Sequence, residues 1–219
     1  MSEKHGLGPF ASQINLQPDP NVPDGKTGIP VIDAAEDIYK KLFIDSATGC
    51  YNRNFFDDFI ENKFNPRRGD EASIIMCDVN GLKEINDKNE GGHSLGDALL
   101  KRTAIFLKEN FIRKGDLVVR YGGDEFIVIC SHVGDKDKFT KEVNQRFNIN
   151  NQKKKNINFA FGIAHFDSQI DIDGLAIPGK QNEDKMKQTT FNRADRLMYS
   201  KKAEQKSQAN LTSHPSTNE

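Results

Sequence analysis

The residues best suited to chemistry lie in the segment Gly122-Gly123-Asp124-Glu125, between β-prone runs at 117–119 and 126–129. Paired glycines between such runs predict a tight hairpin, because both central positions can take positive φ without a Cβ clash. The two carboxylates would project from its tip beside bare backbone, and oxygen ligands suit a hard cation such as Mg²⁺. An ordinary surface hairpin with acidic decoration is the alternative interpretation.

A third acid, Asp78, ends the nearly continuous apolar run 72–79, which predicts a buried central strand. A charge at this position is costly unless it has a partner. If the strand pairs beside the hairpin, Asp78 and Asp124 face one another across neighbouring strands and could share a divalent cation. Mg²⁺ held there could neutralise triphosphate oxygens and activate a hydroxyl for in-line attack. Alternatively, Asp78 could simply cap the turn at Asn80-Gly81.

Hydrophobic periodicity predicts the elements that must position these acids. The core order is β-α-β-β-α-β with a trailing helix, which predicts an α+β fold: a palm-like, ferredoxin-like sheet of mostly antiparallel strands backed by helices. A long polar loop is expected over 167–186. The predicted strands are 72–79, 117–119, 126–129 and 156–166, and the predicted helices are 32–43, 52–64 with Asn52 as N-cap, 94–112, 135–147 and 189–206.

The composition argues against several classes of function. The chain has 219 residues, 36% hydrophobic and 29% charged, with a net charge of −1, so neither a nucleic-acid-coating nor a membrane-seeking surface is indicated. No apolar run approaches the roughly 20 residues of a membrane span, and the first residues lack the apolar region of a signal peptide. Cys50, Cys77 and Cys130 have no metal-binding spacing, which favours reduced, buried thiols. These features predict a cytoplasmic protein.

Five motifs occur in one order between about residues 45 and 206, and together they resemble the GGDEF family of diguanylate cyclases. The motifs are Asp45-x-x-Thr48-Gly49-x-x-Asn52-Arg53, Asp78-x-Asn80-x-x-Lys83-x-Ile85-Asn86-Asp87, Gly92-His93-x-x-Gly96-Asp97, Arg120-Tyr121-Gly122-Gly123-Asp124-Glu125-Phe126 and Ala194-Asp195-x-x-Met198-Tyr199-x-x-Lys202.

The resemblance implies a nucleotidyl cyclase fold and the condensation of two GTP molecules into cyclic di-GMP and two pyrophosphates. In this reaction the 3′-hydroxyl of one nucleotide attacks the α-phosphate of the other, with Mg²⁺ or Mn²⁺ present, two ions in each half-site. Each subunit presents one GTP, so a homodimer is expected, with neither nucleic acid nor a membrane as partner. A catalytically silent receptor for cyclic di-GMP or GTP, and a cyclase of relaxed base choice, are the alternatives.

The resemblance also assigns roles to individual residues. Asp78, Asp124 and the Val79 carbonyl are implied as metal ligands, and Glu125 as a further metal ligand or a catalytic acid. Lys83 is implied at the reacting phosphates. Asn86 and Asp97 match guanine-reading positions, where an Asp that accepts from guanine rejects adenine, which lacks that donor pair. The implied substrate-binding residues are Asn86, His93, Asp97, Gly122, Gly123, Lys202 and Lys206.

A second site is expected at Arg113-x-x-Asp116, which matches the family's inhibitory product-binding motif. Asp116 lies six residues before Gly122, and six extended residues span roughly 20 Å, so this pair should lie at the far end of the strand from the acidic tip. Arg113 could pair with guanine or phosphate, and Asp116 could accept from a guanine edge. A local salt bridge at the helix end is the alternative.

Several residues depart from the family's pattern. Asn80 stands where Asp is usual and Leu82 where an aromatic is usual, and the segment 88–91 is two residues longer than usual. Lys206 replaces an Arg, so it lacks the bidentate fork that grips phosphate.

The expected organisation has four parts. They are an extended arm over 1–31, a short helix or linker over 32–44, the GGDEF domain over 45–206 and a disordered tail over 207–219. The helix in the second part could be a dimerisation element, the end of a signalling linker or a cap on the domain.

Overall fold

The computed structural model describes residues 29–63, 72–88, 92–111, 113, 115–131, 133–152, 157–166 and 180–213. It divides into two compact units, Met1–Asp45 and Ser46–Glu219. In the first unit, α2 (Pro30–Phe43) confirms the helix predicted at 32–43 and begins two residues earlier. Proline is well suited to this first position, because its fixed φ is already helical and its missing N–H would have had no partner in the helix.

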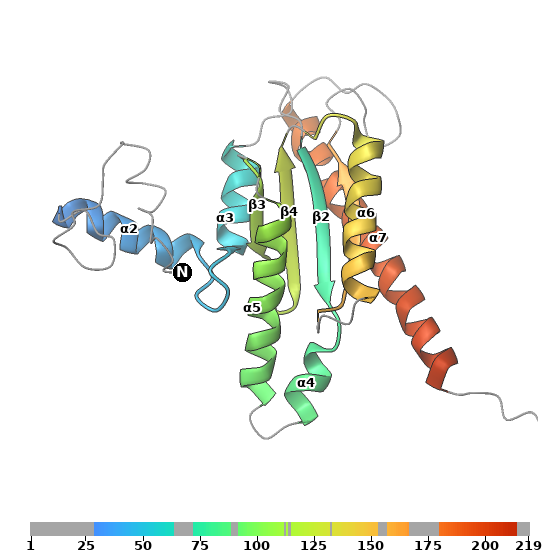
Figure 1. Cartoon of the computed structure of the whole chain (residues 1–219). Coiled ribbons are helices and arrows are strands. Elements are labelled where there is room, and N and C mark those ends of the chain that lie inside the picture. The colour runs from blue at the N-terminus through green and yellow to red at the C-terminus, as the bar shows by residue number, and fades with distance from the viewer. Residues whose placement is uncertain are drawn as a thin grey trace, which may run out of the picture. The chain divides into compact units, whose positions relative to one another are not determined.

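A five-stranded mixed sheet forms the centre of the second unit, with strand order β1-β3-β4-β2-β5 (Figure 1). β2 runs antiparallel to both β4 and β5, and β3 runs antiparallel to β4, while the short β1 pairs parallel with β3. The predicted α+β, mostly antiparallel sheet is therefore confirmed. The strands are β1 (Tyr51–Asn52), β2 (Ala72–Val79), β3 (Leu117–Arg120), β4 (Glu125–Ser131) and β5 (Phe159–His165).

Helices cover both faces of this sheet. Ile75 and Cys77 of β2 belong to a core cluster with α5 and α6, whereas Ile74 and Met76 pack with α3 and α7 on the opposite face. Because side chains alternate along a strand, Asp78 shares the α7 face with Met76. The helices of this unit are α3 (Arg53–Asp58), α4 (Leu82–Lys88), α5 (Gly92–Asn110), α6 (Lys136–Gln152) and α7 (Lys180–Ser213).

Helix α7 lies directly against the backbone of β5. A Cβ atom on Gly162 would overlap the carbonyl oxygen of Ala194 and the backbone nitrogen of Met198. Backbone atoms cannot give way as a flexible side chain can, so only glycine allows this close approach. The contact holds α7 over the sheet, and Lys202, one turn beyond Met198, reaches the end of β2.

Most predicted elements are present, with several corrections. The N-cap prediction is confirmed, since the Asn52 side chain accepts from the Phe55 N–H at 3.1 Å, and a π-helical turn, Phe59–Lys63, continues α3. Helix α4 and strand β1 were not predicted. In α4, Leu82 and Ile85 pack against the core, and the Ile85 N–H donates to the Gly81 carbonyl at 3.0 Å.

The C-terminal helix is longer than predicted. α7 spans Lys180–Ser213, so the predicted loop over 167–186 is wrong at 180–186, and the predicted disordered tail over 207–219 is wrong at 207–213. Residues 167–179 and 214–219, and the expected arm up to residue 28, lie outside the described residues. No helix in the described part of the chain has the length and apolar character needed to cross a membrane.

The three cysteines are free and buried, as predicted. Burial raises the pKa of the Cys77 and Cys130 thiols far above the ordinary value. Both therefore remain protonated and pack as small apolar groups.

Candidate active site

The acidic hairpin and the end of β2 meet in the sheet. Asp78 lies directly opposite Glu125 in the β2–β4 register, and the Val79 N–H donates to the Asp124 carbonyl at 2.9 Å. The prediction that the first strand pairs beside the hairpin is therefore correct. The residue that faces Asp78 in the register is Glu125, while Asp124 lies one position further along.

The hairpin itself differs from the expected turn. Neither Gly122 nor Gly123 has positive φ; instead the N–H groups of Tyr121 and Gly122 both donate to the Glu125 carbonyl, at 2.8 and 3.2 Å. A Cβ on Gly122 would lie 2.5 Å from Glu125 Oε2, whereas a Cβ on Gly123 would meet nothing within 4 Å. Gly122 thus makes room for the Glu125 carboxylate, and Gly123 leaves the tip open to a ligand.

Asp78 is buried at 5% exposure, and its two oxygens differ in their surroundings. Oδ2 accepts a hydrogen bond from Lys202 Nζ at 2.6 Å, and Oδ1 is buried without a hydrogen-bond partner. Burial lowers the pKa of Lys202, but the hydrogen bond and charge of Asp78 outweigh it, so the net pKa is raised and the lysine stays charged. A buried acceptor without a partner is costly, which makes it a candidate ligand for a cation.

Negative charge is concentrated around Glu125. Burial is the largest cause of its raised pKa, and the carboxylates of Asp124, Asp78 and Asp195 raise it further, opposed by Lys202. Like charges held together in this way favour a cation between them. The donor set therefore fits a hard divalent ion. Within the described residues, however, no three His, Cys, Asp or Glu side chains form a metal-binding group, so a bound ion would need further ligands.

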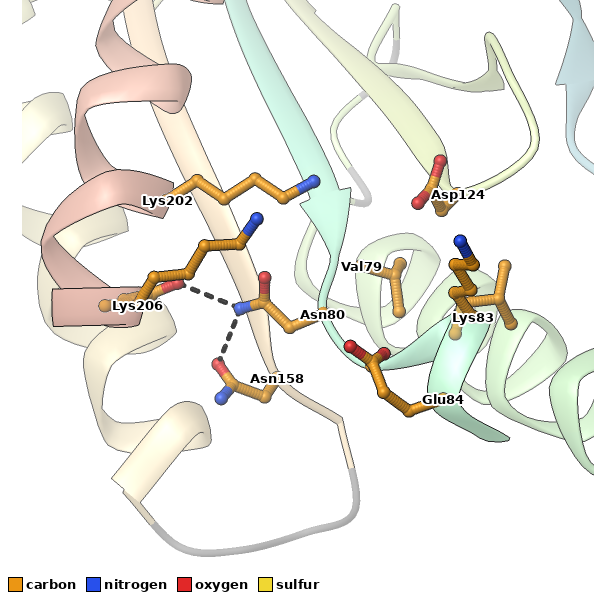
Figure 2. Close-up of a pocket in the computed structure, with 11 residues that line it drawn as sticks. Val79, Asn80, Lys83, Glu84, Asp124, Asn158, Lys202 and Lys206 are labelled. Atoms are coloured by element: carbon orange, nitrogen blue, oxygen red, sulfur yellow. Dashed lines mark hydrogen bonds between the residues drawn. The ribbon is translucent and has the colours of Figure 1, made fainter. Parts of the chain in front are cut away.

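A cavity of about 430 Å³ has Asp124 and three lysines among its lining residues. Figure 2 shows Lys202 and Lys206 extending from α7 toward the end of β2, with Lys83 and Asp124 on the other side of the strand end. The volume is within the usual range of small-molecule sites. Three lysines facing one cavity suit a phosphorylated ligand, because each supplies a point charge and hydrogen-bond donors.

The predicted guanine readers lie on α4 and α5, which pack against each other. Asn86 Oδ1 is buried without a hydrogen-bond partner and packs against Gly96, which directly precedes the exposed Asp97. The two positions are therefore neighbours, but neither lines the cavity. The side chain of His93 and most of the lengthened segment 88–91 lie outside the described residues.

The second predicted site is at the opposite end of β3 from the acidic tip, as expected. Asp116 Oδ2 accepts from the backbone N–H of Arg113 at 3.1 Å, while Oδ1 is buried without a partner. Burial raises the pKa of Asp116, and the backbone hydrogen bond and charge of Arg113, together with the backbone N–H of Ser131, oppose it. The Arg113 side chain is exposed. The local contact therefore runs through the backbone amide of Arg113, and its guanidinium is directed to solvent.

The sequence did not predict three cavity residues, Glu84, Asn158 and Gln205. Gln205 follows Lys202 by three residues and precedes Lys206 by one, so helical spacing could have placed it on the same face. Asn158 directly precedes β5 and had no comparable signal.

Comparison with known proteins places this palm-like α+β domain in a family. The sequence model described as "Diguanylate cyclase, GGDEF domain" matches residues 42–208. This match covers well over half of the chain, so the chain belongs to the GGDEF family, as its motifs predicted.

Solved structures share the fold. The GGDEF domain with coiled coil of DgcB from Caulobacter crescentus, in complex with c-di-GMP, has a TM-score of 0.59 at 19% identity, covering 80% of this chain and 87% of that one. A microbial GGDEF domain described with bis-(3,5)-cyclic di-GMP has a TM-score of 0.58 at 23% identity, covering 77% and 95%. At these identities the likeness concerns the fold.

Curated relatives include two whole proteins of greater length. Diguanylate cyclase DosC from Escherichia coli is 29% identical over 141 residues, which are 60% of this chain and 30% of that protein. Response regulator PleD from Caulobacter vibrioides is 28% identical over 162 residues, or 73% and 34%. The chain thus spans about a third of the length of these relatives.

Proposed function

We propose that this chain is a diguanylate cyclase that condenses two GTP molecules into cyclic di-GMP and two pyrophosphates. The observation that carries the proposal is the placement of buried Asp78 opposite Glu125, beside a cavity lined by Lys83, Lys202 and Lys206. Carboxylates attract a hard divalent cation and lysines attract phosphates, and a metal-bound nucleoside triphosphate satisfies both. Membership in the GGDEF family and relatives named diguanylate cyclases support the same activity.

The acidic residues have the chemistry to hold Mg²⁺ or Mn²⁺. The ligands would be Asp78, Asp124, Glu125 and the Val79 carbonyl, and the orphaned Asp78 Oδ1 supports the fit. When bound, such an ion neutralises triphosphate oxygens and lowers the pKa of a hydroxyl nucleophile. The fit also explains the crowding of carboxylates around Glu125, whose repulsion otherwise only destabilises the fold.

The remaining residues bind and orient the nucleotide. In this proposal Lys83, Lys202 and Lys206 stabilise the charge on the departing pyrophosphate, and the neighbouring positions Asn86 and Asp97, outside the cavity lining, recognise guanine. In each of two equivalent steps, a 3′-oxygen forms a bond to an α-phosphorus, the bond from that phosphorus to pyrophosphate breaks, and the hydroxyl proton is released. Because each chain would present one GTP, ring closure requires a second copy of the chain.

Product inhibition is part of the proposal. Arg113 presents an exposed guanidinium beside Asp116, whose Oδ1 is an unused acceptor, and this pair offers complementary groups to a guanine edge and a phosphate. The structural neighbour DgcB was crystallised with c-di-GMP. Binding of the product at this pair would restrain turnover from the end of β3 opposite the acidic tip.

The direct test is to incubate the purified chain with Mg²⁺ and GTP, or with GTP and ATP, and to identify the products by mass spectrometry. Cyclic di-GMP is expected as the product in both mixtures. GTP binding without any cyclic dinucleotide, at concentrations where the chain is dimeric, would contradict the cyclase and favour a receptor. A mixed GMP–AMP ring would contradict strict guanine recognition. Glu125→Gln should lose turnover, whereas Glu109→Gln, an exposed carboxylate on α5, should retain it.

A further inference from the structure

We propose that Asn80 is a positioning residue that ties α7 to the end of β2, so that Lys202 and Lys206 remain at the phosphate cavity. That the cavity binds phosphate rests on the proposed function, but the contact of Asn80 with α7 can be tested without any nucleotide. Three amide side chains converge at the strand end: those of Asn80, Asn158 and Gln205.

The Asn80 amide nitrogen is the centre of this cluster (Figure 2). Asn80 Nδ2 donates to Gln205 Oε1 at 2.9 Å and to Asn158 Oδ1 at 3.4 Å. The Asn80 backbone N–H also donates to the Asn158 carbonyl at 2.8 Å. A single side chain just after β2 therefore contacts both the residue that precedes β5 and the helix α7.

The polarity of the cluster requires an amide at position 80. Gln205 Nε2 donates to the backbone carbonyl of Phe159 at 3.5 Å, and a carbonyl only accepts, so Gln205 turns its oxygen toward Asn80. Asn80 must then supply an N–H. An Asp at this position, usual in the family, would place a carboxylate against the oxygens of Gln205 and Asn158. Asn80 is thus matched to its partners in this chain.

The cluster holds the turn of α7 that carries the lysines. The buried contact of α7 with the sheet extends to Met198. Beyond it, hydrogen bonds of Lys202 with Asp78 and of Gln205 with Asn80 and Phe159 join α7 to the sheet end. Gln205 lies between the two cavity lysines in sequence. Without this tie, the turn of α7 that carries Lys202 and Lys206 would lose the hydrogen bond between Gln205 and Asn80.

An alternative interpretation, based on the charge that Asn80 lacks, predicts the opposite effect of Asn80→Asp on nucleotide binding. If Asn80 were merely an Asp with a lost charge, Asn80→Asp would restore a carboxylate and tighten nucleotide binding. If Asn80 is the tie, Asn80→Asp should weaken binding at least as much as Asn80→Ala, because the carboxylate faces two acceptor oxygens.

The first experiment measures hydrogen exchange of the full chain without nucleotide. Asn80→Ala, Asn80→Asp and Gln205→Ala should each speed exchange of the α7 amides at 202–208 by about fivefold to tenfold, as expected for one lost hydrogen bond. Exchange in α5 should not change. The double variant Asn80→Ala/Gln205→Ala should match Gln205→Ala within about twofold, because Gln205→Ala already removes the bonds of Gln205 to Asn80 and to Phe159. Lys201→Ala, which breaks an exposed pair with Glu204 on the same turn, is the matched control.

The second experiment measures turnover of GTP. The KM for GTP should rise about fivefold to tenfold in the same variants while kcat changes less than about twofold, since the tie positions phosphate-binding lysines. Gln205→Ala keeps the experiment informative if a change at the strand end impairs folding. Unchanged exchange at 202–208, multiplicative effects in the double variant, or tighter GTP binding by Asn80→Asp would each overturn the proposal. If the chain turns over no GTP, the cyclase proposal fails. The hydrogen-exchange data would still test whether Asn80 holds α7 at the end of β2.

Discussion

Strand β2 buries a polar side chain near each of its ends, and the two differ in how fully they are hydrogen-bonded. At its start, Ser73 is 0% exposed, and its hydroxyl lies 2.6 Å from Nδ1 of His165, whose Nε2 lies 2.9 Å from the Thr140 hydroxyl. At its end, Asp78 has one oxygen bound to Lys202 and the other without a partner, among carboxylates that repel it.

The contrast separates a structural polar cluster from a functional one. Fully paired buried groups stabilise a unique fold, whereas unpaired groups are costly and persist where a ligand uses them. The acidic end of β2 therefore gives up stability that the other end retains. Asp116, with an unpaired Oδ1 beside exposed Arg113, resembles the acidic end in this respect, in agreement with its proposed role in binding product.

The largest expected effect is on turnover, from a change at the acidic end of β2. Asp124→Ala removes a proposed metal ligand but leaves the backbone carbonyl that accepts from the Val79 N–H, so the fold should persist. We expect cyclic di-GMP formation to fall by at least about 10³-fold, measured by quantitative mass spectrometry. Turnover within tenfold of the unmodified chain would show that the acidic tip does not act in the reaction.

A smaller effect is expected at the proposed product site. Arg113→Ala removes the exposed guanidinium and should raise the cyclic di-GMP concentration needed for half-inhibition by about tenfold or more, as for a lost charge-assisted hydrogen bond. Initial rates without added product should not change. Inhibition curves with added cyclic di-GMP provide the measurement, and an unshifted curve would leave Arg113–Asp116 as a local turn only.

A substitution at the start of β2 should lower the free energy of unfolding and leave turnover unchanged. Ser73→Ala leaves Nδ1 of the half-buried His165 without its partner, so the free energy of unfolding should fall by about 1–2 kcal/mol. Denaturant unfolding measures this change. Ser207→Ala is the control, because its exposed hydroxyl bonds only within α7, to the Ala203 carbonyl at 3.0 Å. If Ser73→Ala lost turnover without losing stability, the comparison of the two ends would be wrong.

The smallest expected effect is a pH dependence at the same end. Burial is the first cause of the lowered pKa of His165, Lys136 lowers it further, and Asp137 opposes both. A histidine that resists protonation when folded contributes stability above its ordinary pKa of 6.5, and this contribution is lost as pH falls below that value. Between pH 7.5 and 5.5, the Tm of the unmodified chain should therefore fall about 2 °C more than that of His165→Asn. An equal fall in Tm for the two chains would show that the fold does not lower the pKa of His165.

Much of the fold could be predicted because its signals are local. The apolar run ending at Asp78, the runs that flank Gly122-Gly123 and the Asn52 cap are each contained in a few consecutive residues. Strand β1 has only two residues and no periodicity, and α4 has only Leu82 and Ile85 as its apolar pair.

The sequence predicted several of the residues that line the cavity, but not the contacts between them. The Asn80–Gln205 hydrogen bond joins residues 125 positions apart, and no local pattern could reveal it. The Gly122–Glu125 contact depends on a turn whose φ angles no residue type determines alone. The Asn80–Gln205 contact depends on how α7 packs against the sheet. That packing requires glycine at position 162, because a side chain there would overlap the backbone of α7.

The most direct test of the central claim is the rate of cyclic di-GMP formation by Asp78→Asn, measured together with its unfolding. An amide keeps the shape of the side chain but removes the charge that would hold a metal, that repels Glu125 and that pairs with Lys202. We expect turnover to be lost while the chain still unfolds cooperatively, because the relieved repulsion from Glu125 offsets part of the lost ion pair; Ser73→Ala should instead lower stability and keep turnover. An Asp78→Asn chain that forms cyclic di-GMP at the unmodified rate would contradict the account.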